Sequence, residues 1–537
     1  MQRRNDRKER RDADTYDALW RPYSLAEELS MRAALCGDRP ALADRRGRMT
    51  YGELYRAAEA IAAGLRDRGL RPGDRAILQF PNCIEFVLAV YACLRLGVIP
   101  VLTLPAYREA DIDLFCEAVT PAAYFAPRSF AGYAYAPLVE KMRARHASLR
   151  LFVSDTDGVP DSVPLASLNG DASGMPFPDA AGTAFVLMTG GTTSAPKMIP
   201  KTHRQYYAYA RASAQRCGVT ADSVYMATLP AGHHFSMGSP GIVGAFSQGA
   251  KVVLTPIPTF DEVFPLVEKE KVTVMPAVPP LLRAWTEARS WDSSDLSSLE
   301  RIQVGGGPVD AATLREAREA LQCAIQQAYG FTEGLVCYTD PDEELYEGDM
   351  QIQGRALFDE DELRIVDEAG RDVPPGVTGE LIVRGPCILS SYFAARETLD
   401  PQWLTPDGFY RSGDLAAWTE SGRLLILGRL KDIINRGGEK YAATEIENRL
   451  RSCPGVADAA VVGVPDRMFG ERQCAWLIPE EGTAPPTLAA VHAFLRGQGV
   501  APFKLPDQLE YAERWPLTAA GKINKRQLTL MAEERSA

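Results

Sequence analysis

The sequence predicts an α/β protein with a large N-terminal domain of stacked α/β sheets, a small β-rich subdomain and a small α+β C-terminal domain. Helical and strand patterns alternate through roughly the first 300 residues, as is typical of α/β architecture. Short strands separated by turns follow from about residue 361, and a compact mixture of helices and strands follows from about residue 430.

The N-terminal domain is predicted from a repeated alternation of helix and strand. Residues 51–68 place apolar side chains at helical spacing, and they are followed by an apolar strand at 76–78 and a second helix through 86–92. The alternation returns with a strand at 251–254, a helix over 261–269 and a strand at 272–275. Two similar layers of this kind indicate stacked sheets.

The last third of the chain predicts two smaller parts. Segments 362–366 and 379–384 are typical of short strands in a β-rich subdomain. Beyond 428–432 the pattern predicts helix, strand and helix over 444–451, 459–462 and 487–497. We therefore expect a domain boundary near residue 430, which separates a core of residues 1–430 from a C-terminal domain of residues 431–537.

Composition excludes several classes of protein. The chain has 537 residues, a net charge of −11 and a pI near 5.3, which disfavours nucleic acid as a partner. The charged N-terminal run has no apolar stretch after it, so it predicts a solvated tail rather than a signal peptide. No run of residues is apolar enough for a membrane span. The ten cysteines are scattered along the chain, which predicts a reduced, cytoplasmic protein, and none forms a C-x-x-C pair, so no zinc site is expected.

A polar loop after the apolar strand 184–188 is the strongest local signal. It contains small, hydroxylated and basic residues, namely Thr189, Gly190, Gly191, Thr192, Thr193 and Lys197. Backbone N–H groups and hydroxyls in such a loop can surround phosphate oxygens, and the lysine adds positive charge. The loop differs from the Walker pattern because Lys197 follows Pro196 rather than glycine. A plain polar surface loop remains the alternative on this segment alone.

Further motifs extend the argument over nearly the whole chain. Six ordered segments resemble the core motifs of the superfamily of acyl-CoA synthetases, nonribosomal-peptide adenylation domains and firefly luciferase: residues 189–197, 329–333, 410–414, 428–432, 435–440 and 517–525. This resemblance implies an adenylate-forming ligase that uses ATP and Mg²⁺. It also implies that the C-terminal domain is mobile.

The resemblance implies a role for each matched residue. Lys522 is the expected catalytic lysine, Glu333 the ligand of Mg²⁺, and Thr332 a partner of phosphate. Tyr329 would lie against adenine, while Asp414 and Arg429 would bind the ribose. The expected ATP site is completed by Thr189, Gly190, Gly191, Thr192, Thr193, Lys197, Gly306 and Gly307.

Within the superfamily, the chain most resembles stand-alone aryl-acid adenylating enzymes of siderophore pathways, which activate 2,3-dihydroxybenzoate or salicylate. Shared segments are 190–193, 200–203, 239–241, 303–306, 326–327, 333–336 and 434–440. The acid is expected to contact His233, His234, Phe235, Ser239, Gly305 and Val336. Three glycines at 305–307 can line a slot for a flat ring, although a tight turn would also explain them.

Two features bear on which acid is used. Amino-acid-activating relatives carry an aspartate in the loop matching 232–239, whereas this chain has His234 there and no carboxylate, so an α-amino acid is disfavoured. Aryl-acid enzymes usually have Asn at that position, so the histidine leaves salicylate, 2,3-dihydroxybenzoate and a nitrogen-bearing aromatic acid open. A packing role for His234 is equally open. Ser194 stands where the family usually has glycine, which predicts a slightly reshaped phosphate loop.

The resemblance also implies a second half-reaction. A hinge at Lys431 would rotate the C-terminal domain and expose a thiol tunnel near Gly437, Gly438 and Lys440. The expected acceptor is the phosphopantetheine arm of an aryl carrier protein supplied in trans, in siderophore or other nonribosomal peptide biosynthesis. Free coenzyme A is the alternative acceptor. A catalytically inactive nucleotide-binding regulator is a third hypothesis, disfavoured because Glu333, Asp414 and Lys522 are all present.

Overall fold

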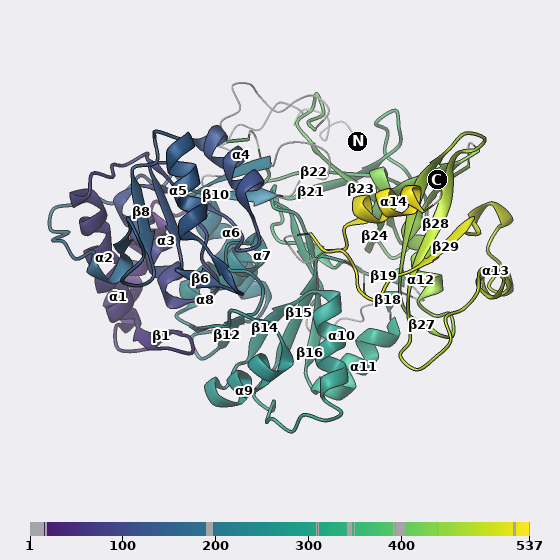
Figure 1. The fold of residues 1–537 in the computed structure, drawn as a ribbon, viewed down its shortest axis with the longest axis horizontal. Helices are drawn as coiled ribbons and strands as arrows, with labels where there is room; N and C mark the ends of the chain where they lie inside the picture. The colour runs from purple at the N-terminus through teal and green to yellow at the C-terminus, as the bar shows by residue number, and fades with distance from the viewer. Residues whose placement is uncertain are drawn as a thin grey trace, which may run out of the picture. The chain divides into compact units, whose positions relative to one another are not determined.

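The computed structural model describes residues 16, 19–189, 197–307, 309, 311–340, 346–347, 350–389, 392–393, 403–437, 439–518 and 522–535. They divide into two compact units. The first unit comprises Met1–Leu345, Gly354–Glu362 and Arg384–Gly408, and the second comprises Tyr346–Gln353, Leu363–Val383 and Phe409–Ala537. Figure 1 shows the chain in sequence colours.

One sheet of the first unit has seven strands in the described part of the chain, in the order β11-β10-β4-β3-β5-β8-β9. Their bounds are β3 (Arg75–Leu78), β4 (Ile99–Leu102), β5 (Ala123–Ala126), β8 (Leu151–Ser154), β9 (Val163–Pro164), β10 (Thr183–Thr189) and β11 (Lys197–Thr202). All neighbours are parallel except β10 and β11. The parallel strands are short apolar runs because helices cover them.

Helices of this layer follow the predicted alternation. The helix expected over 51–68 is α2 (Tyr51–Asp67), which begins at a capping box formed by Thr50 and Glu53. The helix expected through 86–92 is α3 (Ile84–Leu96), whose side chains are nearly all buried. The remaining helices are α1 (Leu25–Cys36), α4 (Glu109–Val119) and α5 (Ala136–Arg145).

The second sheet of the first unit has nine described strands, in the order β2-β1-β13-β12-β14-β15-β16-β17-β20. Their bounds are β1 (Pro40–Ala43), β2 (Arg48–Thr50), β12 (Val224–Ala227), β13 (Lys251–Leu254), β14 (Val274–Ala277), β15 (Arg301–Gly305), β16 (Ala324–Gly330), β17 (Val336–Tyr338) and β20 (Arg355–Ala356). Its helices are α6 (His203–Arg216), α7 (His234–Gly238), α8 (Gly241–Gln248), α9 (Phe260–Glu270), α10 (Pro279–Ala288) and α11 (Ala311–Leu321). The two sheets confirm the predicted α/β architecture (Figure 1).

Two sheets also organise the second unit. One has the order β21-β22-β23-β24, with β21 (Glu362–Val366), β22 (Gly379–Arg384), β23 (Tyr410–Trp418) and β24 (Leu424–Arg429), and it confirms the β-rich subdomain. The other contains β25 (Ile433–Arg436), β26 (Glu439–Ala442), β27 (Val456–Asp466), β28 (Gly470–Pro479) and β29 (Gln508–Tyr511). Its helices are α12 (Ala443–Leu450), α13 (Leu488–Gly497) and α14 (Lys525–Glu534).

The expected boundary near residue 430 lies where β24 ends and a short 3₁₀ turn, Leu430–Asp432, leads into β25. Both sheets on either side of this turn belong to the second compact unit. The division into residues 1–430 and 431–537 therefore stays a prediction. No helix in the described ranges has the length and apolar character that crossing a bilayer requires.

Candidate active site

The predicted phosphate loop connects two antiparallel strands. Thr189 at the end of β10 lies opposite Lys197 at the start of β11, and helix α6 begins only at His203. A Walker loop leads directly into a helix, so this hairpin is a different way to present a polar loop. Gly190, Gly191, Thr192, Thr193 and Ser194 lie outside the described residues, as does the side chain of Thr189.

Lys197 is the described basic residue of this loop. Its Nζ lies 3.4 Å from the centroid of the Trp403 ring and 5.5 Å from that of Tyr392. These distances are typical of cation–π contacts, which hold the ammonium group at the start of β11 while leaving its charge intact.

The predicted adenine and magnesium motif forms a tight turn after β16. Tyr329 lies near the end of this strand, and Thr332 and Glu333 follow with only 8% and 7% of their surfaces exposed. Gly334 has φ +142°, and a Cβ there would lie 1.9 Å from the Cys387 carbonyl oxygen, so only glycine fits. The turn therefore holds the Glu333 carboxylate in a nearly buried position.

The glycine segment 305–307 lies beside that turn. Strands β15 and β16 are parallel, with Gly305 opposite Ala328, so their carboxyl ends meet at one edge of the sheet. Gly306 has φ +86°, which favours glycine. The structure thus places the glycine segment beside the end of β16, where Tyr329 lies.

Gly305 also lies against an aromatic side chain of the expected acid pocket. A Cβ at this position would lie 2.7 Å from the Ala328 carbonyl oxygen and 3.3 Å from Cε1 of Phe235. The absence of a side chain therefore lets Phe235 approach the sheet. Val336, 4% exposed and opposite Gly330 in β17, supplies an apolar surface on the neighbouring strand.

His233 and His234 have different roles in the structure. His233 precedes the short helix α7, and its Nδ1 accepts a hydrogen bond from the Phe235 N–H at 3.2 Å. His234 is buried, and hydroxyl groups of Tyr206 and Tyr209 lie 3.2 Å from its Nδ1 and 3.1 Å from its Nε2. Both ring nitrogens of His234 therefore have partners inside the protein.

The ring of His234 is held neutral. Burial lowers its pKa well below 6.5, and the nearby charges of Lys201 and His233 lower it further. The Tyr209 hydroxyl also lies 2.8 Å from Oγ of Ser239, the other polar residue expected to contact the acid. His234 and Ser239 are thereby linked through a tyrosine.

Three residues of this region were absent from the sequence prediction. Tyr206 and Tyr209 are three positions apart on α6, a spacing that places them on one helix face, and this was the available signal. Lys201 in β11 is 3% exposed. Burial lowers the pKa of this lysine to about 8, although the nearby Cys387 and Glu333 act to raise it. Lys201 lies in the segment 200–203 that resembles the aryl-acid enzymes, but no local pattern indicated that its side chain is buried.

The expected ribose site lies in the second unit. Asp414 and Arg429 face each other on β23 and β24, and Nε of Arg429 lies 2.6 Å from Oδ1 of Asp414. Asp414 is 2% exposed, and its backbone N–H donates to Oγ of Ser412 at 3.0 Å. A buried carboxylate with one cationic partner can still accept hydrogen bonds from ligand hydroxyls.

Lys522 lies on a tight chain reversal. Leu517 and Ile523 form an antiparallel bridge, and the Thr518 N–H donates to the Lys522 carbonyl oxygen at 2.7 Å. The lysine is exposed, with residues 519–521 outside the described ranges. These two contacts therefore hold the backbone of Lys522 beside that of Thr518.

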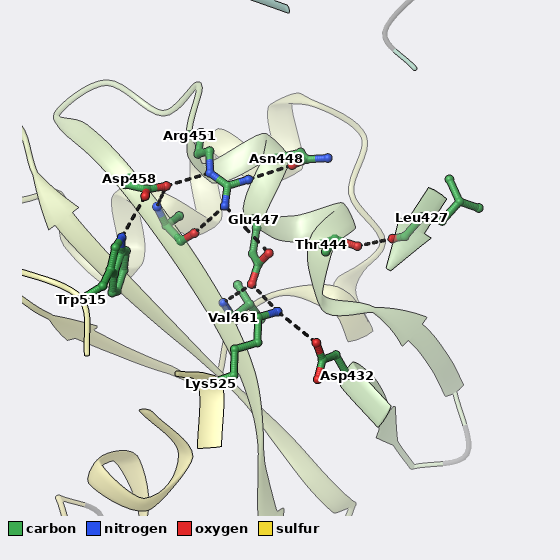
Figure 2. Close-up of polar contacts among 11 residues, drawn as sticks. Leu427, Asp432, Thr444, Glu447, Asn448, Arg451, Asp458, Val461, Trp515 and Lys525 are labelled. Carbon is green, nitrogen blue, oxygen red and sulfur yellow. Dashed lines mark hydrogen bonds and ion pairs between the residues drawn. The ribbon is translucent and has the colours of Figure 1, made fainter. Parts of the chain in front are cut away.

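A buried polar cluster anchors the chain just after this reversal (Figure 2). Nζ of Lys525 lies 2.7 Å from Oε1 of Glu447 and 3.9 Å from Oδ2 of Asp432, in the 3₁₀ turn. Glu447 also accepts from the Val461 N–H at 2.7 Å. These contacts tie helix α14 to α12, β27 and the turn that contains the expected hinge.

The expected hinge and thiol-tunnel residues surround that turn. Lys431 is half-buried, and burial lowers its pKa while Asp432 opposes the change. Gly437 has φ +63° and donates its N–H to the Phe469 carbonyl at 2.8 Å. Lys440 pairs with Asn435 across β25 and β26, whereas Gly438 and the side chain of Lys440 lie outside the described set.

Comparison with known proteins identifies the family of this chain. The family model described as AMP-binding enzyme matches residues 29–393, and that of the AMP-binding enzyme C-terminal domain matches residues 445–522. The chain is 38% identical to 2,3-dihydroxybenzoate-AMP ligase of Bacillus subtilis, covering 97% of this chain and 96% of that protein. It is 40% identical to salicyl-AMP ligase / salicyl-S-ArCP synthetase of Mycobacterium tuberculosis, covering 94% and 90%.

A solved structure gives the same result in three dimensions. The apo structure of MbtA from Mycobacterium smegmatis has a TM-score of 0.73 and 38% sequence identity, covering 96% of this chain and 97% of that one. Both the sequence and the fold therefore match over nearly their full lengths. The chain belongs to the family of AMP-binding enzymes.

Proposed function

We propose that this enzyme uses ATP to activate an aryl carboxylic acid as an aryl adenylate and then transfers the aryl group to the phosphopantetheine thiol of an aryl carrier protein. The observation that carries this proposal is the close approach of the Phe235 ring to Gly305, next to the buried, neutral His234. A flat ring suits such a surface, and the segment 232–239 offers no carboxylate to an α-ammonium group. The ligases for dihydroxybenzoate and salicyl groups named above support this substrate class.

The first half-reaction needs no base. The substrate carboxylate is already an anion, and its oxygen attacks the α-phosphorus of ATP. The bond from that phosphorus to the oxygen bridging to the β-phosphorus breaks, and pyrophosphate leaves with the electron pair. Lys522 would stabilise the charge that develops during this displacement, while Lys197 and the loop before it would hold the β- and γ-phosphates.

The Thr332–Glu333 turn fits the binding of Mg²⁺ with the nucleotide. Carboxylate and hydroxyl oxygens are hard ligands, as Mg²⁺ prefers. In the described ranges, no group of three or more His, Cys, Asp or Glu side chains could hold a metal ion without other ligands. Mg²⁺ is usually held by one or two carboxylates together with substrate phosphates and water. Glu333 would hold the ion, which would neutralise phosphate charge when bound.

The remaining nucleotide contacts are proposed from the site geometry. Tyr329 would present its ring to adenine, next to the glycines at 306 and 307. Asp414 would accept hydrogen bonds from the ribose hydroxyls while Arg429 keeps its carboxylate oriented. These residues would fix the α-phosphorus relative to the acid, which lowers the entropy cost of the attack.

Transfer to the thiol is proposed to require rotation of residues 431–537 about Lys431. Gly437, Gly438 and Lys440 would then line the path of the phosphopantetheine arm. Figure 2 shows a bond that spans this turn: the Thr444 hydroxyl donates to the Leu427 carbonyl, so the two sides of the proposed hinge are linked. A large rotation would have to break this bond.

The substrate class is tested by ATP–pyrophosphate exchange with matched aromatic, aliphatic and α-amino acids. Exchange with aryl acids at a kcat/KM well above that of the other classes is expected. Preference for an α-amino or aliphatic acid would refute the proposal. Mass spectrometry of a holo aryl carrier protein and of coenzyme A, offered together, then identifies the acceptor, and exclusive formation of the coenzyme A thioester would reject the carrier-protein step.

The role of Lys522 is tested by separating the two half-reactions. Lys522→Ala should slow adenylate formation by roughly 10²- to 10³-fold, the scale for losing one electrostatic contact to a transition state. Transfer from preformed aryl-AMP should change far less. Arg496→Ala, which removes another exposed cation of the second unit, is the matched control. Equal loss in both half-reactions would contradict a role confined to adenylation.

A further inference from the structure

Four side chains form a continuous hydrogen-bonded chain next to the expected acid pocket. Tyr206 contacts Nδ1 of His234 at 3.2 Å, Nε2 of the same ring contacts Tyr209 at 3.1 Å, and Tyr209 contacts Oγ of Ser239 at 2.8 Å. All four residues are buried, with exposed fractions of 1–6%. We refer to Tyr206, His234, Tyr209 and Ser239 as the tyrosine–histidine chain.

Packing holds this chain in one arrangement. The Tyr209 ring stacks on His234 with centroids 4.9 Å apart and an interplanar angle of 29°. The Tyr206 ring lies edge-on to Phe185 at 4.6 Å. A Cβ at residue 238 would lie 2.4 Å from the Tyr206 hydroxyl, so Gly238 leaves the space that this hydroxyl occupies.

The number of protons on His234 limits how the chain can be arranged. A neutral imidazole has one N–H donor and one acceptor nitrogen, and each tyrosine has one O–H proton. If Nε2 carries the proton, it donates to Tyr209, which is then free to donate to Ser239. The Ser239 proton is left for a ligand.

The other tautomer reverses the chain. If Nδ1 carries the proton, Tyr209 donates to Nε2 and accepts from Ser239. Ser239 then has only lone pairs left to offer to a ligand. The tautomer of His234 therefore decides whether Ser239 acts as a donor or as an acceptor.

We propose that Tyr209 is a specificity-determining residue that couples the tautomer of His234 to the hydrogen-bonding direction of Ser239. The pocket then distinguishes aromatic acids by the group that faces Ser239: a ring nitrogen selects the donor state, and an amino group selects the acceptor state. This inference rests on the proposed function, in which Ser239 contacts the acid. Tyr209 touches no reacting atom in this scheme and acts by positioning Ser239.

Of two neighbouring tyrosines, one contacts the chain and the other provides a control. Tyr338 is buried near Ser213 and Ser239. Burial raises the pKa of Tyr338, and hydrogen bonding to these two serine hydroxyls opposes the rise. Tyr338 is therefore a second polar neighbour of Ser239. Tyr207 follows Tyr206 in sequence but interacts with Glu28 instead of the chain. Removing the hydroxyl of Tyr207 therefore leaves the chain intact, whereas Tyr209→Phe breaks it and keeps the ring stacked on His234.

The test observes the tautomer directly. The protein has five histidines, so nitrogen-15 labelling of histidine gives few imidazole signals, and loss of one in His234→Gln assigns it. Pyridine-2-carboxylate and 2-aminobenzoate are the probes, and benzoate is the reference acid. We expect the first to place the proton on Nε2 and the second to place it on Nδ1. The same tautomer with both probes would overturn the proposal.

Kinetics give an independent readout. In Tyr209→Phe, the kcat/KM advantage of the two polar probes over benzoate should fall by about tenfold, since one aligned buried hydrogen bond is lost. Benzoate itself should change little, and Tyr207→Phe should keep the wild-type ranking. An unchanged ranking in folded Tyr209→Phe would also refute the coupling. Exchange with none of the aryl acids would instead reject the proposed function, which the wild-type enzyme tests first.

Discussion

Replacement of the buried Lys201 by methionine should change the pH dependence of stability in a defined direction. Burial lowers the pKa of this lysine from 10.5 to about 8. Between these values the unfolded chain binds a proton that the folded chain does not, so stability rises with pH across this window. A difference of about 2.5 pKa units corresponds to about 3 kcal/mol. Below pH 8 the full cost of the buried charge is present.

The assay compares guanidinium unfolding of wild type and Lys201→Met at several pH values from 7 to 10.5. The free energy of unfolding of wild type, relative to the variant, should rise by about 3 kcal/mol between pH 8 and 10.5. Buried tyrosines and cysteines with raised pKa values lower stability over the same range, but they are common to both proteins and cancel in the difference. Parallel profiles would refute the argument that this lysine is desolvated.

Two further changes test the structure at other points. His203 has a pKa lowered by burial to about 4, and its ring nitrogen accepts a hydrogen bond from the Leu25 N–H, so the free energy of unfolding should fall by about 3 kcal/mol as pH drops from 6.5 to 4. His203→Asn keeps an acceptor and should remove this pH dependence in unfolding measurements. If the pH dependence persists in the variant, other groups cause it. Gly305→Ala places a methyl group 2.7 Å from the Ala328 carbonyl oxygen, so it should lower the free energy of unfolding by about 1–3 kcal/mol and raise KM for the acid. Gly307→Ala should have a mild effect, because a methyl group there would lie 3.5 Å from its nearest neighbour. Equal effects of the two variants on steady-state kinetics and melting would argue against a slot at Gly305.

Several features of this enzyme follow from local sequence. Helix α2 was predicted over 51–68 because its apolar spacing acts within one or two turns, and the structure adds the capping box of Thr50 and Glu53. The ordered motifs that resemble the family also assigned roles to Glu333, Asp414 and Lys522, and these roles stay predictions. Family membership and the α/β fold could be inferred at this level.

The surroundings of His234 depended on tertiary structure. His234 is 28 residues from Tyr206 and 25 from Tyr209, so its hydrogen bonds could not be read from neighbouring positions. The sequence left open whether His234 was neutral or cationic, and desolvation by packed residues determines that it is neutral.

The sequence by itself determined which chemical groups the protein carries and in what order: a polar loop expected to bind phosphate, a motif with a carboxylate and a lysine near the C-terminus. Only the tertiary structure decided that the loop joins the antiparallel strands β10 and β11. Strand β10 takes its place in the sheet by also pairing with β4, which is distant in the sequence. The tertiary structure likewise decided that Lys201 is buried near Glu333. Strand pairing and desolvation both depend on groups far apart in the chain, and local patterns contain no information about their distance in the fold.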